Sequence, residues 1–153
     1  MKPIIWLTGQ PGSGKTTLAN ELRIALGYPC PFIIDGDDLR SIFANPNYSK
    51  EGRYENIRTA QRIAQYLQSK GEIAIVSLVA PYRELREELK AKATVLEVYL
   101  HTDEVRGREK FFAQDYEPPL NNFLDINTGD NIDDSTQKIL AEYWSVAASS
   151  RRA

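Results

Sequence analysis

Short apolar runs alternate along the chain with longer segments in which apolar residues recur at helical spacing. The runs at residues 3–7, 32–34, 73–79 and 95–100 are typical of strands buried in a parallel sheet. A weaker run lies near residues 123–126. The pattern therefore predicts five strands.

The segments between and after these runs predict helices over residues 17–26, 50–70, 82–93, 102–110 and 133–148. Strands that alternate with helices form a parallel sheet covered by helices on both faces. We therefore expect an α/β fold with three α/β/α layers around a parallel five-stranded sheet. Ligands of such sheets bind at the carboxyl ends of the strands. No repeat or linker interrupts the pattern, so residues 1–153 are expected to form a single domain.

A glycine-rich segment follows the first predicted strand and precedes the first predicted helix. Residues 9–16 read Gly-Gln-Pro-Gly-Ser-Gly-Lys-Thr and match the P-loop pattern G-x-x-x-x-G-K-[ST]. The glycines let the backbone turn tightly and aim its N–H groups at phosphate oxygens, and the helix N-terminus adds positive partial charge. Lys15 is placed to reach the β- and γ-phosphates of ATP, and Thr16 to ligate Mg²⁺. The predicted nucleotide-binding residues are Gly9, Gly12, Ser13, Gly14, Lys15, Thr16 and Thr17.

The position of the acidic residues indicates which class of P-loop protein this is. A GTPase would carry an Asn-Lys-x-Asp motif, and no asparagine of the chain is followed by lysine. A motor ATPase would end a central strand in an acid, but the run at 73–79 continues into Ala80-Pro81. The acids follow the second strand instead, at Asp35 and Asp37. This arrangement favours a small-molecule kinase with the fold of P-loop nucleoside kinases.

Asp35 and Asp37 are separated by one glycine at the end of a predicted strand. One carboxylate is expected to orient Mg²⁺ through its water shell, and the other to accept the proton of an acceptor hydroxyl. The alternative is a helix N-cap, a role that aspartate often fills and that suits Asp38. Arg40 and Arg53 lie downstream, with Asn56 and Arg58. They either grip an anionic substrate or form a solvated surface, and spacing alone leaves both possibilities open.

Composition and charge narrow the range of partners. The net charge of −2 does not favour nucleic acid. Cys30 is the only cysteine, which excludes an intramolecular disulfide and a cysteine-based zinc site. The apolar run Ile4–Leu7 is too short for a signal peptide or a membrane span. We therefore expect a cytoplasmic protein that binds small molecules and neither nucleic acid nor membrane.

Four segments, in their order along the chain, resemble adenylyl-sulfate kinases (APS kinases). They are the P-loop, Asp-Gly-Asp-Asp-Leu-Arg at 35–40, Asn-Pro-Asn-Tyr-Ser at 45–49 with Arg-Tyr-Glu-Asn-Ile-Arg at 53–58, and Ile-Val-Ser-Leu-Val-Ala-Pro-Tyr-Arg at 75–83. The resemblance implies ATP- and Mg²⁺-dependent phosphorylation of the 3′-hydroxyl of adenosine 5′-phosphosulfate (APS), as in sulfate assimilation. It also implies a homodimer, a state common in the family.

The resemblance assigns roles to individual residues. Lys15, Asp35 and Asp37 would be catalytic, with Asp37 nearest the acceptor hydroxyl and Asp35 beside the metal with Thr16. The predicted substrate-binding residues beside Asp37 are Arg40, Arg53 and Asn56 for the phosphosulfate, Tyr48 stacked on the base, and Pro81 and Tyr82 at the floor. Phe112, from the segment that corresponds to the family's lid, is also predicted to bind the substrate.

Three departures from the family pattern bear on the acceptor. Asp38 replaces an asparagine. Ala80 replaces a serine that some members phosphorylate, so direct in-line transfer is expected. The long basic lid of the family is reduced to residues 104–112, whose positive side chains are Arg106, Arg108 and Lys110. These side chains either close over phosphates, with Phe111 or Phe112 covering the base, or form the solvated face of a short helix. A kinase of another acceptor, such as cytidine diphosphoramidate in surface-polysaccharide modification, and a non-catalytic nucleotide-binding regulator remain the alternatives.

Overall fold

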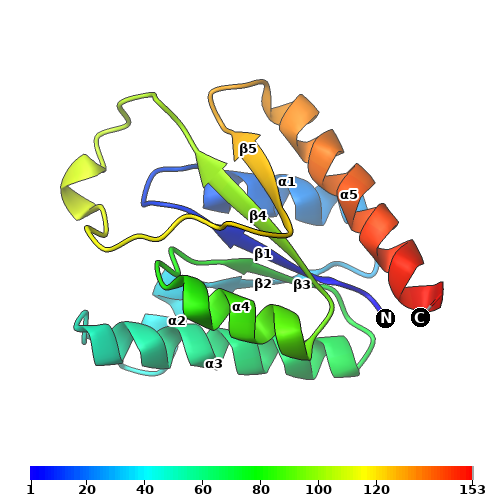
Figure 1. The fold of residues 1–153 in the computed structure, drawn as a ribbon, viewed down its shortest axis with the longest axis horizontal. Helices are drawn as coiled ribbons and strands as arrows, with labels where there is room; N and C mark the ends of the chain where they lie inside the picture. The colour runs from blue at the N-terminus through cyan, green and yellow to red at the C-terminus, as the bar shows by residue number, and fades with distance from the viewer. Residues whose placement is uncertain (153) are drawn as a thin grey trace.

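A computed structural model describes residues 1–152 and shows three layers, with helices on both faces of a central sheet (Figure 1). The sheet has five parallel strands in the order β2-β3-β1-β4-β5. The strands are β1 (Ile4–Thr8), β2 (Phe32–Asp35), β3 (Ala74–Ser77), β4 (Val95–His101) and β5 (Phe123–Asn127). The predicted α/β fold with its five-stranded parallel sheet is therefore confirmed.

Alternate residues of the central strand β1 pack into two separate hydrophobic cores, one on each face of the sheet. Ile4 and Trp6 pack against one group of helices, whereas Ile5 and Leu7 pack against the other, as the two-residue period of a strand requires. The first core includes side chains of α2 (Gly36–Ile42), α3 (Lys50–Ser69) and α4 (Arg83–Lys92). The second includes side chains of α1 (Lys15–Leu26) and α5 (Ile132–Arg152).

The predicted helix over 102–110 is wrong. Residues 102–108 are irregular, and only a short 3₁₀ turn, η1 (Glu109–Phe111), forms there. Gly107 has a φ of 80°, which an α-helix excludes, and Arg106 donates to loop groups far along the chain instead of to its own segment alone. The charged side chains of this segment therefore project from a loop.

The order of the strands places a crevice beside the end of β1. In the sheet, β1 separates the half formed by β2 and β3 from the half formed by β4 and β5. The carboxyl end of β1 is therefore the topological switch point, and parallel sheets bind ligands at such a point. The glycine-rich loop of residues 9–14 starts there and leads into α1. Within residues 1–152, no helix combines the length and the apolar character that crossing a bilayer needs.

Candidate active site

The glycine-rich loop has backbone conformations that depend on glycine. Gly12 and Gly14 have φ angles of 82° and 101°, and Gly14 directly precedes the first residue of α1. A Cβ on Gly9 would lie 2.4 Å from the carbonyl oxygen of Leu100, so only glycine fits between the loop and β4. The first turn of α1 has no side-chain cap, which leaves its N–H groups free for an anion.

Lys15 is folded over this loop. Its Nζ donates to the carbonyl oxygens of Gly9 at 3.0 Å and Gln10 at 2.9 Å. Burial lowers the pKa of Lys15 from 10.5 to about 8, although Asp35 and Asp37 raise it. The Lys15 ammonium group is therefore held at the loop by neutral carbonyl oxygens.

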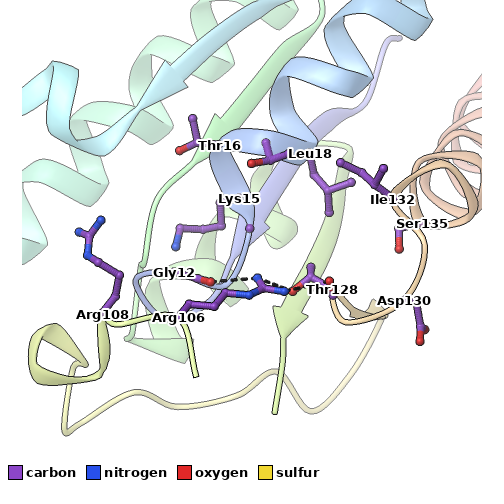
Figure 2. A pocket seen from close by; sticks show the side chains of 12 residues that line it. Gly12, Lys15, Thr16, Leu18, Arg106, Arg108, Thr128, Asp130, Ile132 and Ser135 are labelled. Atoms are coloured by element: carbon purple, nitrogen blue, oxygen red, sulfur yellow. Dashed lines mark hydrogen bonds between the residues drawn. The ribbon is translucent and has the colours of Figure 1, made fainter. Parts of the chain in front are cut away.

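A cavity of about 460 Å³, the donor cavity, lies on the α5 side of the loop (Figure 2). The loop, the start of α1 and the connection from β5 to α5 line it. Its lining residues include Gly12, Lys15, Thr16, Thr17, Arg106, Thr128, Asp130 and Ser135. The size of the cavity and its contact with the loop suit the nucleoside and phosphates of a nucleotide.

Arg106 ties the two walls of the donor cavity together. Its guanidinium donates to the carbonyl oxygen of Gly12 at 3.0 Å and to the carbonyl oxygen of Thr128 at 3.0 Å, as Figure 2 shows. The Thr128 hydroxyl in turn donates to the carbonyl oxygen of Ser13 at 2.6 Å. Glu104 accepts from the other edge of the guanidinium at 2.9 Å. These bonds fix the loop to the β5–α5 connection.

A second cavity, the acceptor cavity, has a volume of about 760 Å³ and lies on the other side of the loop, towards α2 and α3. Five separate segments of the chain contribute predicted site residues to it. These residues are Lys15, Thr16, Asp35, Asp37, Arg40, Tyr48, Arg53, Asn56, Pro81 and Phe112. The tertiary structure thus brings together residues that are up to 97 positions apart, from Lys15 to Phe112.

Asp35 is the N-cap of α2. Its Oδ1 accepts from the backbone N–H groups of Asp37 at 2.9 Å and Asp38 at 3.2 Å. The cap reading therefore applies to Asp35 rather than to Asp38. These two bonds hold the carboxylate at the end of β2, where Asp35 lines the cavity, while the exposed Asp37, the second residue of α2, lines the same cavity.

Two arginines of the acceptor cavity, Arg40 and Arg53, are already bonded to protein groups. Arg40 donates to the carbonyl oxygens of Asn45 at 3.1 Å and Asn47 at 2.8 Å, and its guanidinium lies 3.9 Å from the ring centre of Tyr48. Arg53 forms an ion pair of 3.2 Å with Asp115. The two cations are thus positioned, but part of their charge is compensated.

The loop that carries Tyr48 is seated on α3. Ser49 caps this helix by accepting from the N–H of Gly52, and a Cβ on Gly52 would lie 2.1 Å from the carbonyl oxygen of Asn47. Asn56, buried one turn later, donates to the carbonyl oxygen of Gly36 at 3.3 Å. Asn56 therefore connects α3 to the start of α2, and Tyr48 stands exposed at the rim of the cavity.

Tyr82 does not line the acceptor cavity. It is buried in the core on the α3 and α4 side, where its ring centre lies 4.7 Å from that of Tyr54. Only Pro81, the residue before it, faces the cavity. The prediction that Pro81 and Tyr82 both form the floor is therefore corrected for Tyr82, because the chain turns into α4 at this point.

A buried ion pair holds the floor in place. The Arg86 Nε donates to Glu97 Oε2 at 2.7 Å, with both side chains 1% exposed. The same guanidinium donates to the carbonyl oxygens of Ala80 and Glu117. Ala80 has a φ of 45°, a strained conformation for a residue with a Cβ, and it precedes the floor residue Pro81.

The segment after η1 is attached next to the P-loop. Gln10 exchanges two hydrogen bonds with the backbone of Ala113, at 2.8 and 2.9 Å. Upstream, Arg108 lines both the donor and the acceptor cavity, whereas Lys110 and Phe112 line the acceptor cavity. Segment 104–112 therefore contributes side chains to both cavities.

Sequence reasoning missed several lining residues. Thr128 and Asp130 belong to the connection from β5 to α5, and Ser135 belongs to the first turn of α5; all three are far from every motif in the sequence, and no spacing rule links them to the P-loop. Ser77 belongs to a strand, as the sequence predicts, but its place in the motif at 75–83 does not by itself indicate that it lines the cavity. A polar residue at the carboxyl end of a buried strand was the available signal for Ser77.

No group of three or more histidine, cysteine, aspartate or glutamate side chains gathers anywhere in residues 1–152 in a way that would hold a metal ion by itself. Mg²⁺ in phosphotransferases is bound by one or two protein oxygens and by substrate phosphates, so it needs no such cluster. Thr16 and Asp35 at the junction of the cavities fit this mode of binding.

Comparisons with known proteins agree with this geometry. Residues 1–122 match the family described as adenylylsulphate kinase. The chain is 35% identical over 160 residues to an adenylyl-sulfate kinase of Gloeothece citriformis, covering 89% of this chain and 90% of that protein. It is 34% identical over 154 residues to a probable adenylyl-sulfate kinase of Archaeoglobus fulgidus, covering 86% and 99%. The solved structure of the Mycobacterium tuberculosis APS kinase CysC in complex with AMPPNP and APS has a TM-score of 0.78 at 24% identity, covers 91% of this chain and 95% of that one, and shows the shared fold.

Proposed function

Because the chain belongs to the adenylylsulphate kinase family, we propose that it transfers the γ-phosphate of ATP to the 3′-hydroxyl of APS, giving ADP and 3′-phosphoadenosine 5′-phosphosulfate (PAPS). One observation carries the proposal. The donor and acceptor cavities share Gly12, Lys15, Thr16 and Arg108, so a phosphate held there is accessible from both sides. Phosphoryl transfer needs this placement of donor and acceptor in line.

The donor half follows from the loop. The backbone N–H groups at the start of α1 receive the β- and γ-phosphates, and Lys15 turns from its loop carbonyls to the phosphates. Thr16 and Asp35 are the residues that would hold Mg²⁺. The metal, when bound, neutralises charge on the phosphates during transfer. Arg108, which faces both cavities, adds positive charge where the transferred group passes.

The acceptor half uses Asp37 as the group that accepts the hydroxyl proton. Asp37 is exposed in the acceptor cavity and has no role in capping α2, so its carboxylate is available. Arg40, Arg53 and Asn56 face the anionic end of the substrate. Tyr48 at the rim and Phe112 on the opposite segment supply flat surfaces for the base.

The transfer is direct. The residue before Pro81 is Ala80, which is buried and has no hydroxyl to carry a phosphoryl group. The phosphorus–oxygen bond to ADP therefore breaks while the bond to the 3′-oxygen forms, with the proton passing to Asp37.

The test is an assay of the protein with ATP, Mg²⁺ and APS, in which ADP release is followed and the product is identified by mass spectrometry. PAPS formation at a rate of about 1–100 per second is expected. A panel of adenosine- and cytidine-based acceptors, including a cytidine diphosphoramidate, runs beside it. Turnover only with another acceptor would reject APS as the substrate, and ATP binding without any turnover would reject the kinase proposal.

Three further properties complete the proposal: one kinase domain over residues 1–153, a homodimer, and a cytoplasmic location. Sedimentation velocity of the purified chain tests the second, because a dimer would sediment as a species of twice the 17.3 kDa chain mass. Limited proteolysis tests the first, because one domain yields no stable smaller fragment.

A further inference from the structure

Ser77 carries a buried hydroxyl group without a partner. It is the last residue of β3, is 3% exposed, and its Oγ has no hydrogen-bond partner within residues 1–152. Buried polar groups are satisfied in the great majority of cases, and an unsatisfied one is unfavourable. The neighbouring strand end gives a contrast, because the buried Thr8 hydroxyl contacts both the carbonyl oxygen of Val79 and the Tyr116 hydroxyl.

The register of the sheet places the Ser77 side chain under the start of α1. Val76 and Leu78 belong to the core on the α3 and α4 side, so Ser77 lies on the other face, in line with Ile75. On that face its partners across the sheet are Leu7 in β1 and Asp35 in β2. Paired residues in parallel strands point the same way, and Ser77 is therefore in the row of Asp35.

The same place is where the proposed metal would bind. Ser77 lines the acceptor cavity together with Lys15, Thr16 and Asp35. Thr16 comes from the first turn of α1, Asp35 from the end of β2, and Ser77 from the strand between β2 and β1. A serine adds almost no core volume over alanine, so burial alone gives no reason for a hydroxyl at this position.

We propose that the Ser77 hydroxyl hydrogen-bonds a water molecule in the coordination shell of Mg²⁺. Mg²⁺ keeps several of its waters when it binds to proteins, and these waters need oxygen partners. In this arrangement Thr16 ligates the metal and the two paired strand ends, Asp35 and Ser77, hold its water shell. The inference rests on the proposed use of ATP and Mg²⁺, and it is independent of the identity of the acceptor.

The test measures metal affinity in the nucleotide complex, without any acceptor. Mn²⁺, a spectroscopic substitute for Mg²⁺, is titrated into the protein–ADP complex and followed by electron paramagnetic resonance. Loss of one such hydrogen bond in Ser77→Ala should weaken Mn²⁺ binding roughly three- to tenfold. ADP affinity in EDTA should stay within about twofold of the parent chain, and Ser77→Thr, which keeps the hydroxyl, should retain more of the metal affinity than Ser77→Ala.

Thr8→Val is the matched control, because it removes a buried hydroxyl whose partners are protein groups. It should lower the melting temperature and leave the ratio of metal-bound to metal-free ADP affinity unchanged. Ser77→Cys, of similar size and with a weak hydrogen-bonding group, replaces Ser77→Ala if the latter does not fold.

Equal Mn²⁺ affinity in the parent chain and in Ser77→Ala, or in Ser77→Cys where that variant replaces it, would overturn the inference. A loss of ADP affinity in Ser77→Ala that is equal with and without metal would overturn the inference as well, because the hydroxyl would then support the phosphate-binding loop and not the metal. A failure with APS in the activity assay leaves this measurement unaffected.

Discussion

The donor and acceptor cavities are built in different ways. The donor cavity takes half of its lining from one continuous segment, residues 12–18, whose shape depends on glycines and on backbone N–H groups. Apart from residues 11–16, the acceptor cavity is assembled from the ends of two strands, from α2, α3 and the loop before α3, and from the segment 108–113. A site built from backbone groups tolerates side-chain substitutions outside its motif. A site built from side chains of several segments changes its ligand specificity when any of these side chains is substituted.

Two cations, Lys15 and Arg53, are held by groups of different charge. Lys15, which lines both cavities, is held by neutral carbonyl groups, which a phosphate can replace. Arg53, which lines the acceptor cavity, is paired with the carboxylate of Asp115. An anionic acceptor must compete with that carboxylate. We therefore expect removal of Lys15 to weaken nucleotide binding more than removal of Arg53 weakens acceptor binding.

The largest effect is expected from Lys15→Ala. Removing the charge that reaches the phosphates should lower kcat/KM by more than about 10³-fold, because no other lysine lines the donor cavity. Steady-state kinetics measures this loss, and an unchanged melting temperature shows that the fold persists. Retained turnover would mean that the loop is not the phosphate site.

Asp37→Asn should be the next largest change. Loss of the proton acceptor should lower kcat by about 10²–10³-fold with little change in ADP affinity, because Asp37 lies on the acceptor side. Asp38→Asn, which alters the neighbouring exposed carboxylate, is the control and should lower kcat by less than about twofold. A loss confined to nucleotide affinity would contradict the place given to Asp37.

Nucleotide affinity should fall as the pH rises above 8. The pKa of Lys15 in the fold is about 8, below its ordinary 10.5, because of burial. Phosphates bind the charged form, so at pH 9 the affinity for ADP should be up to about tenfold weaker than at pH 7.5. Calorimetry across this range measures it, and Lys15→Arg, which stays charged, should show little of the drop. A flat profile for the parent chain would contradict the assignment.

The same group affects stability in the opposite direction. Since the folded pKa of Lys15 is lower than the unfolded one, the unfolded chain binds more protons between pH 8 and 10.5. The contribution of Lys15 to the free energy of unfolding therefore rises with pH across that window.

The smallest effect is expected from Asp115→Asn. Releasing Arg53 from an ion pair that is partly exposed should lower KM for the acceptor about two- to fivefold and leave KM for ATP unchanged. Glu88→Gln is the matched control, since it breaks a similarly exposed pair with Arg58 on the same helix. A raised acceptor KM in Asp115→Asn would show instead that the carboxylate itself contacts the acceptor.

Local patterns predicted the strands and most helices because burial on two faces produces continuous apolar runs and helical spacing. The segment 102–110 was predicted wrongly, because its charges and its few apolar residues suit a helix locally. Its actual conformation depends on Arg106 reaching Gly12 and Thr128, partners that spacing cannot reveal. Tyr82 was predicted wrongly for a related reason. A sequence motif identifies neighbouring residues, but it does not show which of their side chains point into the cavity and which into the core.

The sequence by itself determined the phosphate-binding loop and the acids after the second strand. Each is a contiguous motif, so its functional groups belong to residues that are adjacent in the chain. Only the tertiary structure decided that Asp115 pairs with Arg53, that Arg86 donates to the carbonyl oxygen of Ala80, and that Ser77 is paired with Asp35 across neighbouring strands. These contacts join residues far apart in the chain. They depend on strand order and register, which set which side chains meet at the end of the sheet.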